Sequence, residues 1–171
     1  MSTIAPSGAR LQGSSGNDEI QTPQYLYDRL NRAFCFDFDA FAALDNTKVR
    51  QHFSTISGTF CLSAFDEPVR VDSRDGFEYP WADLRVWANP PYSMFMEAVA
   101  KFEAEVESAG WIAMLVKVDT STRWYQRLEE CAIVQPLKRR VKFTHPNPPR
   151  GWSGASFASA IAFPRRDWVA L

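Results

Sequence analysis

The sequence lacks any apolar run of the roughly 18 residues that a membrane-spanning helix requires, which excludes a helical membrane protein. Its amino-terminal stretch has no apolar segment of the kind found in secretory signals. Cysteine and histidine are scarce, with 3 and 2 copies, and no Cys-x-x-Cys pair occurs. We therefore expect no disulfide framework and no metal site, and we expect reduced, mostly buried thiols in a cytoplasmic protein.

Aromatic residues are abundant by contrast, at 14% of the 171 residues, and 46% of the residues are hydrophobic. This composition is sufficient for one domain with a substantial core. The net charge of −1 conceals an asymmetry, because residues 1–110 are acidic overall and residues 111–171 are basic. A basic part can contact phosphates, although two solvated faces of opposite sign are the simpler interpretation of charge alone.

Residues 1–18 are rich in Ser and Gly, which is typical of a flexible tail, and we expect residues 19–171 to form a single domain. Thr22 is the expected N-cap of the first helix, with Pro23 in its first turn. The alternation of helices and strands predicts an α/β fold with a mostly parallel central sheet flanked by helices. The apolar spacing predicts helices at 23–34, 95–110 and 124–130, and strands at 36–40, 85–88, 111–116, 132–134, 141–144 and 157–163.

The tetrapeptide Asn89-Pro90-Pro91-Tyr92 directly follows the strand predicted at 85–88. The prolines fix a rigid corner, at which the Asn89 side-chain oxygen and the Pro90 carbonyl can act as paired acceptors for a planar amino group. Tyr92 can stack on the ring that carries this group. Acceptors aimed at both amino hydrogens favour a more nucleophilic nitrogen, which is electrostatic preorganisation. The alternative is an ordinary turn between a strand and a helix.

Together with other segments in the same order, this motif gives the chain a family resemblance. From about residue 17 to about residue 165, the chain resembles the phage-type DNA N6-adenine methyltransferases of the Dam group. The matching segments are Thr22-Pro23-x-x-Leu26, Phe36-Asp37-Phe38-Asp39-Ala40 followed by Asn46, Asp75-Gly76 with Trp81, residues 87–93, residues 139–143 and residues 156–163.

The resemblance implies a Rossmann-like S-adenosylmethionine-dependent methyltransferase fold, with S-adenosylmethionine as cofactor and DNA as partner. Adenine N6 would be the acceptor, reached by base flipping because N6 is paired and stacked in a duplex. The implied catalytic residues are Asn89, Pro90, Pro91 and Tyr92. The implied cofactor-binding residues are Thr22, Pro23, Asp37, Asp39 and Ala40, together with Asp75, for which an ordinary turn is the alternative.

A cluster of cations lies in the basic carboxy-terminal part of the chain. We expect Arg139, Arg140, Lys142 and Arg150 to contact DNA phosphates. The alternative is a solvated edge strand with protective charges.

The resemblance has one clear departure, because Phe41-Ala42-Ala43 stands where methyltransferases commonly have a glycine-rich loop. Two other functions therefore stay open. One is methylation of another planar amine, such as cytosine N4, an RNA base or a glutamine amide. The other is a nucleic-acid-binding module without catalysis. The sequence leaves open the target sequence and the oligomeric state, and a phage or prophage origin would place the protein in the cytoplasm of a bacterial host.

Overall fold

The computed structural model describes residues 20–42, 48, 52–54, 59–61, 68–70, 76–77, 79–145, 147–148, 150–152 and 154–165. The tail expected at residues 1–18 lies outside them. In chain order the elements are α1 (Gln24–Phe34), β1 (Phe38–Ala42), β2 (His52–Ser54), β3 (Thr59–Cys61), β4 (Pro68–Arg70), β5 (Arg85–Ala88), the 3-10 helix η1 (Tyr92–Met94), α2 (Phe95–Glu105), β6 (Trp111–Lys117), α3 (Arg123–Cys131), β7 (Ala132–Pro136) and β8 (Ser159–Pro164).

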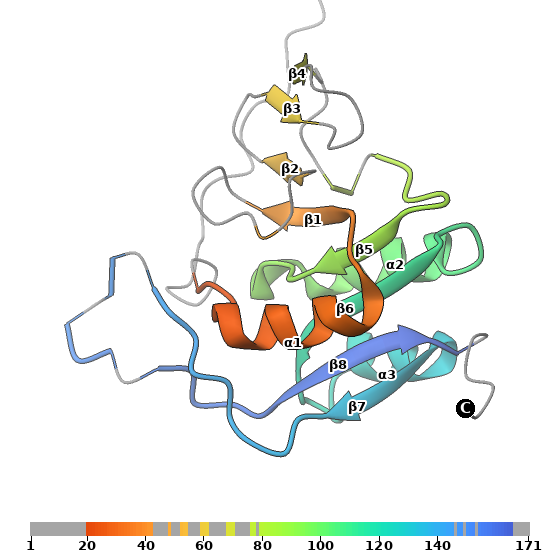
Figure 1. The fold of residues 1–171 in the computed structure, drawn as a ribbon. Coiled ribbons are helices and arrows are strands. Elements are labelled where there is room, and N and C mark those ends of the chain that lie inside the picture. Colours follow the sequence, from red (N-terminus) through yellow and green to blue (C-terminus); the bar gives the residue numbers. More distant parts are fainter. Residues whose placement is uncertain are drawn as a thin grey trace, which may run out of the picture.

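Six of these strands form one sheet in the order β2-β1-β5-β6-β8-β7 (Figure 1). The strands β2, β1, β5 and β6 pair in parallel, whereas β8 is antiparallel to both of its neighbours. The connections through α2 and α3 are the crossovers that strands of equal direction require. β3 and β4 form a separate antiparallel pair. The predicted α/β class, with helices flanking the sheet, is confirmed.

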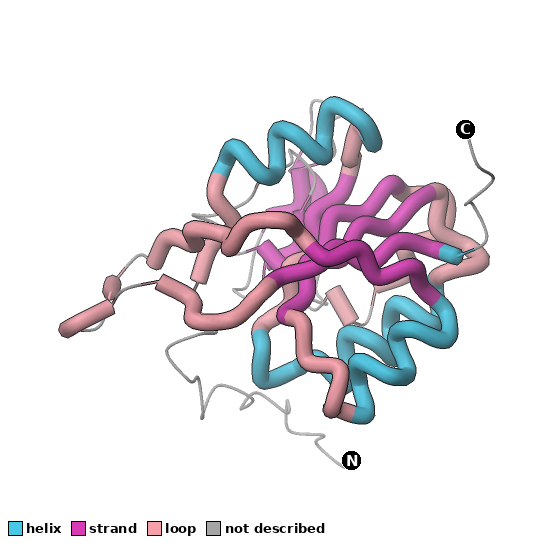
Figure 2. Tube along the Cα trace, turned by 90° about the horizontal axis from the view of Figure 1, so that it is seen from below, coloured by secondary structure: helices cyan, strands magenta, loops and turns pink. Residues whose placement is uncertain are grey.

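Helices cover both faces of the sheet, as Figure 2 shows. The apolar alternation along β6 explains this arrangement, because strand side chains point to opposite faces in turn. Ile112, Met114 and Val116 pack into the cluster that contains α2 and α3. Ala113 and Leu115 pack into the cluster that contains α1. A fully buried Leu or Ile stabilises the fold by about 1.5–3 kcal/mol, so both layers depend on this strand.

The expected helix at 23–34 is present as α1, but its N-cap differs from the prediction. Pro23 occupies the N-cap position, and the structure shows no side-chain hydrogen bond that caps the helix. Pro23 has φ −66° and ψ 142°, so the chain enters the helix one residue later than predicted. The hydroxyl of Thr22 is thereby left for another role.

The strand expected at 141–144 is absent from the structure. Val141 and Phe143 are buried and alternate with exposed residues, as in a strand. Their neighbour is the short stretch before α1, and only Gln21 and Thr144 form a β-bridge. Because Pro23 and α1 follow Gln21 immediately, no partner is available to extend the pairing.

The expectation of mostly buried thiols is wrong for Cys35, which is exposed. It follows the last turn of α1 in a left-handed conformation with φ 51°, and its N–H donates to Asn31 O at 2.8 Å. The thiol of Cys131 is partly buried.

Candidate functional site

The site predicted from the sequence lies where the strand order of the sheet reverses. β1 and β5 are adjacent and parallel, with Asp39 opposite Trp87. The sheet continues from β1 to β2 on one side and from β5 to β6 on the other (Figure 1). In open α/β sheets, ligands bind outside the carboxyl ends of the strands at such a reversal. The residues that follow β5 and those that end β1 therefore occupy the edge where a ligand is expected.

Asn89 is the first residue after β5, and its side-chain oxygen is buried without a partner. Within the described part of the chain, no donor lies within hydrogen-bond distance of Asn89 Oδ1. Burying such an oxygen unsatisfied costs about 1–3 kcal/mol. Pro90 is buried beside it, and Pro91 has φ −55° and ψ 138°. Since neither proline has an N–H, this corner presents acceptors rather than donors.

The ring of Tyr92 is held by three other aromatic rings. Its centroid lies 5.1 Å from that of Phe95, with a tilt of 34°. Phe157 and Phe143 lie edge-on to it, both at 88°, with centroids at 4.9 and 6.5 Å. Edge-to-face contacts of this kind fix the orientation of a ring as well as burying it. Phe157 is not among the site residues predicted from the sequence, since it stands alone before the small residues of β8.

Thr22 stands immediately before the N-cap of α1, at the same edge of the sheet. α1 and β1 run in opposite directions and are joined by residues 35–37, so the start of α1 lies toward the carboxyl end of β1 (Figure 1). Thr22 is 3% exposed, and Pro23 is also buried. Thr22 Oγ1 has no hydrogen-bond partner among the described residues. It is a second buried oxygen at this edge that lacks a donor or acceptor.

Asp39 is a buried carboxylate in the middle of β1. Its Oδ2 accepts a hydrogen bond from the Lys48 N–H at 3.1 Å. Burial raises the pKa of Asp39 to about 7, against the opposing effect of backbone hydrogen bonds from Lys48 and Phe41. Tyr27 on α1 has a raised pKa, because of burial first and then the charge of Asp39. A group with these properties is well placed to accept a hydrogen bond from a ligand.

The end of β1 is in close contact with Gly76. A Cβ at Gly76 would overlap the carbonyl oxygen of Ala40, so only glycine permits this approach. Ala40 itself is buried. Asp75, the remaining candidate for cofactor binding, lies outside the described residues.

Asp37 is not brought together with the other candidates. It precedes β1, and its carboxylate accepts hydrogen bonds from Arg85 N at 2.7 Å and Arg85 Nε at 3.1 Å. Arg85 is the first residue of β5, so this ion pair lies at the amino ends of the two strands. Asp37 is therefore separated from Asn89 by the full length of β5.

The four predicted DNA-contacting cations are all exposed, namely Arg139, Arg140, Lys142 and Arg150. No carboxylate within the described ranges forms an ion pair with any of them. The bridge between Gln21 and Thr144 joins the end of this segment to the residue before Thr22. Arg139, Arg140 and Lys142 thus precede a residue that is joined to the stretch before Thr22, whereas Arg150 lies beyond this bridge.

No helix among the described residues is long and apolar enough to cross a membrane. No group of three or more His, Cys, Asp or Glu side chains among them could hold a metal ion.

The fold is that of an α/β protein in which an acceptor corner follows a central strand at the point where the strand order reverses. A family model described as DNA N-6-adenine-methyltransferase (Dam) matches residues 69–170, which is more than half of the chain. The chain belongs to this family, and the resemblance seen in its motifs is confirmed. Membership supports a DNA adenine methyltransferase in general terms. The matched range includes Asn89–Tyr92 and the four cations, but not the candidates on β1 and before α1. No curated protein matches the chain.

Proposed function

We propose that the chain is an S-adenosylmethionine-dependent enzyme that methylates N6 of adenine in DNA. The observation that carries this proposal is the buried, unpartnered Oδ1 of Asn89 at the strand-order reversal. An adenine amino group brings two N–H donors, and Asn89 Oδ1 with the Pro90 carbonyl would accept both. The family membership makes adenine the expected base.

In this mechanism the protein positions the reacting groups and stabilises the developing charge. Adenine N6 would be reached by flipping the nucleotide out of the duplex onto the ring of Tyr92. Asn89 Oδ1 and the Pro90 carbonyl would accept both amino hydrogens and draw electron density toward the nitrogen, and the proton that the methylated nitrogen releases would pass to solvent. Bound S-adenosylmethionine would supply the electrophilic methyl group.

The residues at the end of β1 and before α1 fit this cofactor. Thr22 Oγ1 is buried and lacks a partner, and Asp39 is a buried acceptor suited to the ammonium or hydroxyl groups of the cofactor. Pro23 and Ala40 would supply apolar contacts, and Asp75 remains a proposed contact. Asp37 is left out of the proposed site because Arg85 holds its carboxylate at the opposite end of β5.

We further propose the methyltransferase variant of the Rossmann-like fold, in a single domain that starts at residue 19. DNA phosphates would be contacted by Arg139, Arg140, Lys142 and Arg150, whose charges face solvent. A DNA substrate places the enzyme in the cytoplasm, that of a bacterial host if a phage encodes it.

The test is to incubate the protein with S-adenosylmethionine and unmethylated DNA, or RNA in parallel, and to identify methylated nucleosides by mass spectrometry. We expect N6-methyladenine from DNA, and its loss in Asn89→Ala. Gln135→Ala, which removes an exposed amide from β7, is the matched control and should stay active. N4-methylcytosine or a methylated RNA base would redirect the proposal to that acceptor. Cofactor binding without any methylated product would favour a non-catalytic module.

A further inference from the structure

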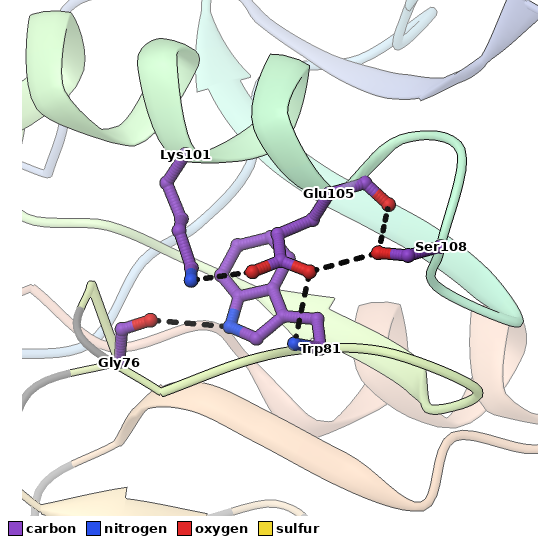
Figure 3. Close-up of polar contacts among 5 residues, drawn as sticks. All are labelled: Gly76, Trp81, Lys101, Glu105 and Ser108. Carbon is purple, nitrogen blue, oxygen red and sulfur yellow. Dashed lines mark hydrogen bonds and ion pairs between the residues drawn. The ribbon is translucent and has the colours of Figure 1, made fainter.

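Glu105, at the end of α2, is a carboxylate whose oxygens are fully engaged within the fold. Lys101 Nζ lies 2.6 Å from Oε1, and Oε2 accepts from Ser108 Oγ at 3.0 Å and from the Trp81 N–H at 3.1 Å (Figure 3). Burial raises the pKa of Glu105, but these hydrogen bonds outweigh burial and leave the pKa below its ordinary value. The Glu105 carboxylate is therefore ionised near neutral pH, and its hydrogen bonds hold it in place.

Trp81, whose main-chain N–H donates to Glu105, has a fully buried side chain. Its indole Nε1–H donates to the carbonyl of Gly76 at 3.1 Å, and Lys101 Nζ lies 5.5 Å from its ring centroid (Figure 3). The ring also lies edge-on to Phe41 of β1, at 6.1 Å. A buried hydrogen bond of this kind has no competing water, so it fixes the carbonyl firmly.

Gly76 completes a chain of contacts that ends at the proposed cofactor site. It packs so closely on the Ala40 carbonyl that even a Cβ would not fit. The described residues between 76 and 81 form neither helix nor strand, so no backbone ladder sets their position. Among the described residues, the indole of Trp81 and the Ala40 carbonyl of β1 contact Gly76 and fix its position.

We propose that Glu105 is a positioning residue for cofactor binding. It holds Trp81, and through the indole N–H of Trp81 it holds Gly76 against Ala40 of β1, one of the proposed cofactor contacts. This inference rests on the proposed function, since it requires that this edge binds S-adenosylmethionine. Glu105 does not touch the reacting atoms, so it acts on cofactor affinity and leaves the rate of methyl transfer at saturation unchanged.

The primary test is Trp81→Phe, which keeps an apolar ring but removes the donor to Gly76 together with part of the buried indole volume. By calorimetry, we expect the Kd for S-adenosylmethionine to rise about tenfold, which corresponds to losing one buried hydrogen bond. At saturating cofactor, kcat and the KM for DNA should stay within about twofold, a split that a general loss of structure would not produce. An unchanged Kd, or a lower kcat at saturation, overturns the proposal.

Glu105→Asp is the second variant, because it keeps the charge and shortens the side chain. We expect it to raise the cofactor Kd severalfold with kcat unchanged, so the proposal is tested even if Trp81→Phe fails to fold. Glu103→Gln is the matched control on the same helix, where Glu103 is exposed and paired with Arg127, and it should leave the Kd unchanged. If the unaltered protein methylates DNA but both variants bind cofactor normally, this inference alone fails. If the unaltered protein binds no cofactor, the proposed function fails with it.

Discussion

Asp37, just before β1, and Asp39, within β1, are two residues apart, yet they have opposite surroundings. Asp37 is partly exposed, and Arg85 satisfies its carboxylate at the amino ends of β1 and β5. Asp39 is enclosed, and burial raises its pKa to about 7. At the amino ends of β1 and β5, the ion pair between Asp37 and Arg85 therefore satisfies the polar side chains. At the other end, Asn89 Oδ1 and Thr22 Oγ1 have no hydrogen-bond partner among the described residues, and a binding site needs such groups.

The largest expected effect comes from the unsatisfied acceptor at the open end. Asn89→Ala should lower kcat by about 10²- to 10³-fold, because it removes a preorganised acceptor for the reacting amino group. Circular dichroism and thermal unfolding should show a stability equal to or above that of the parent, since the lost oxygen has no partner in the fold. Activity near the parental level in Asn89→Ala would remove this residue from the site.

The next effect is a pH dependence of cofactor binding to which Asp39 contributes. The ionised carboxylate is the form that accepts a hydrogen bond from the cofactor, and its pKa of about 7 means that it is mostly protonated at pH 6. The Kd for S-adenosylmethionine should therefore fall about tenfold from pH 6 to pH 8. In Asp39→Asn the Kd should be higher at pH 8 and nearly independent of pH, as measured by calorimetry. The same pH profile in parent and variant would contradict this assignment.

A smaller effect is expected from the exposed cations beside the site. Lys142→Gln should raise the KM for DNA severalfold and leave kcat and the cofactor Kd unchanged. The slope of log affinity against log salt should decrease by about one for each phosphate contact that is lost. Lys138→Gln, an exposed neighbour outside the predicted set, serves as the comparison. An equal loss in both variants would indicate general attraction rather than a specific contact.

The smallest effect is expected at the closed end of the strands. Asp37→Asn breaks a partly exposed ion pair, which contributes about 0–1 kcal/mol, so urea unfolding should show only a slight destabilisation. The cofactor Kd and kcat should match those of the parent. A rise in the cofactor Kd comparable to that of Asp39→Asn would return Asp37 to the site and erase the distinction between the two ends.

Elements whose side chains show a clear apolar period could be predicted from the sequence. The strand at 85–88 and the buried run of β6 followed from continuous apolar residues, and the helices from their spacing. Pairing could not be predicted for residues 141–144, because their alternation is strand-like while their neighbour offers a single bridge. The N-cap at Thr22 was wrong because a hydroxyl before proline indicates a cap without fixing the residue at which the helix begins.

The candidate site was predictable only where a motif stands at the end of a strand. Asn89 follows a recognisable strand and precedes a helix, so its place at the carboxyl edge could be inferred. Asp37 and Asp39 look equivalent in the sequence, and only the start of β1 and the partner Arg85 separate them. The anchor at Glu105 is invisible in the sequence, because its contact with Trp81 spans 24 residues and depends on the packing of α2.

Because β8 runs antiparallel to both of its neighbours, the segment that connects β7 to β8 can vary in sequence and length. The first residue of β8, Ser159, pairs with Lys117 at the carboxyl end of β6, so the chain leaves β7 and enters β8 at one and the same edge of the sheet. The intervening residues 137–158, which carry the exposed cations, form a hairpin connection rather than a crossover. Such a connection can lengthen, shorten or exchange its residues without altering strand order. If the proposed function holds, the exposed positions of this connection are where a change of DNA target sequence would least disturb the acceptor corner, whereas Phe143 and Phe157 in the same connection hold Tyr92.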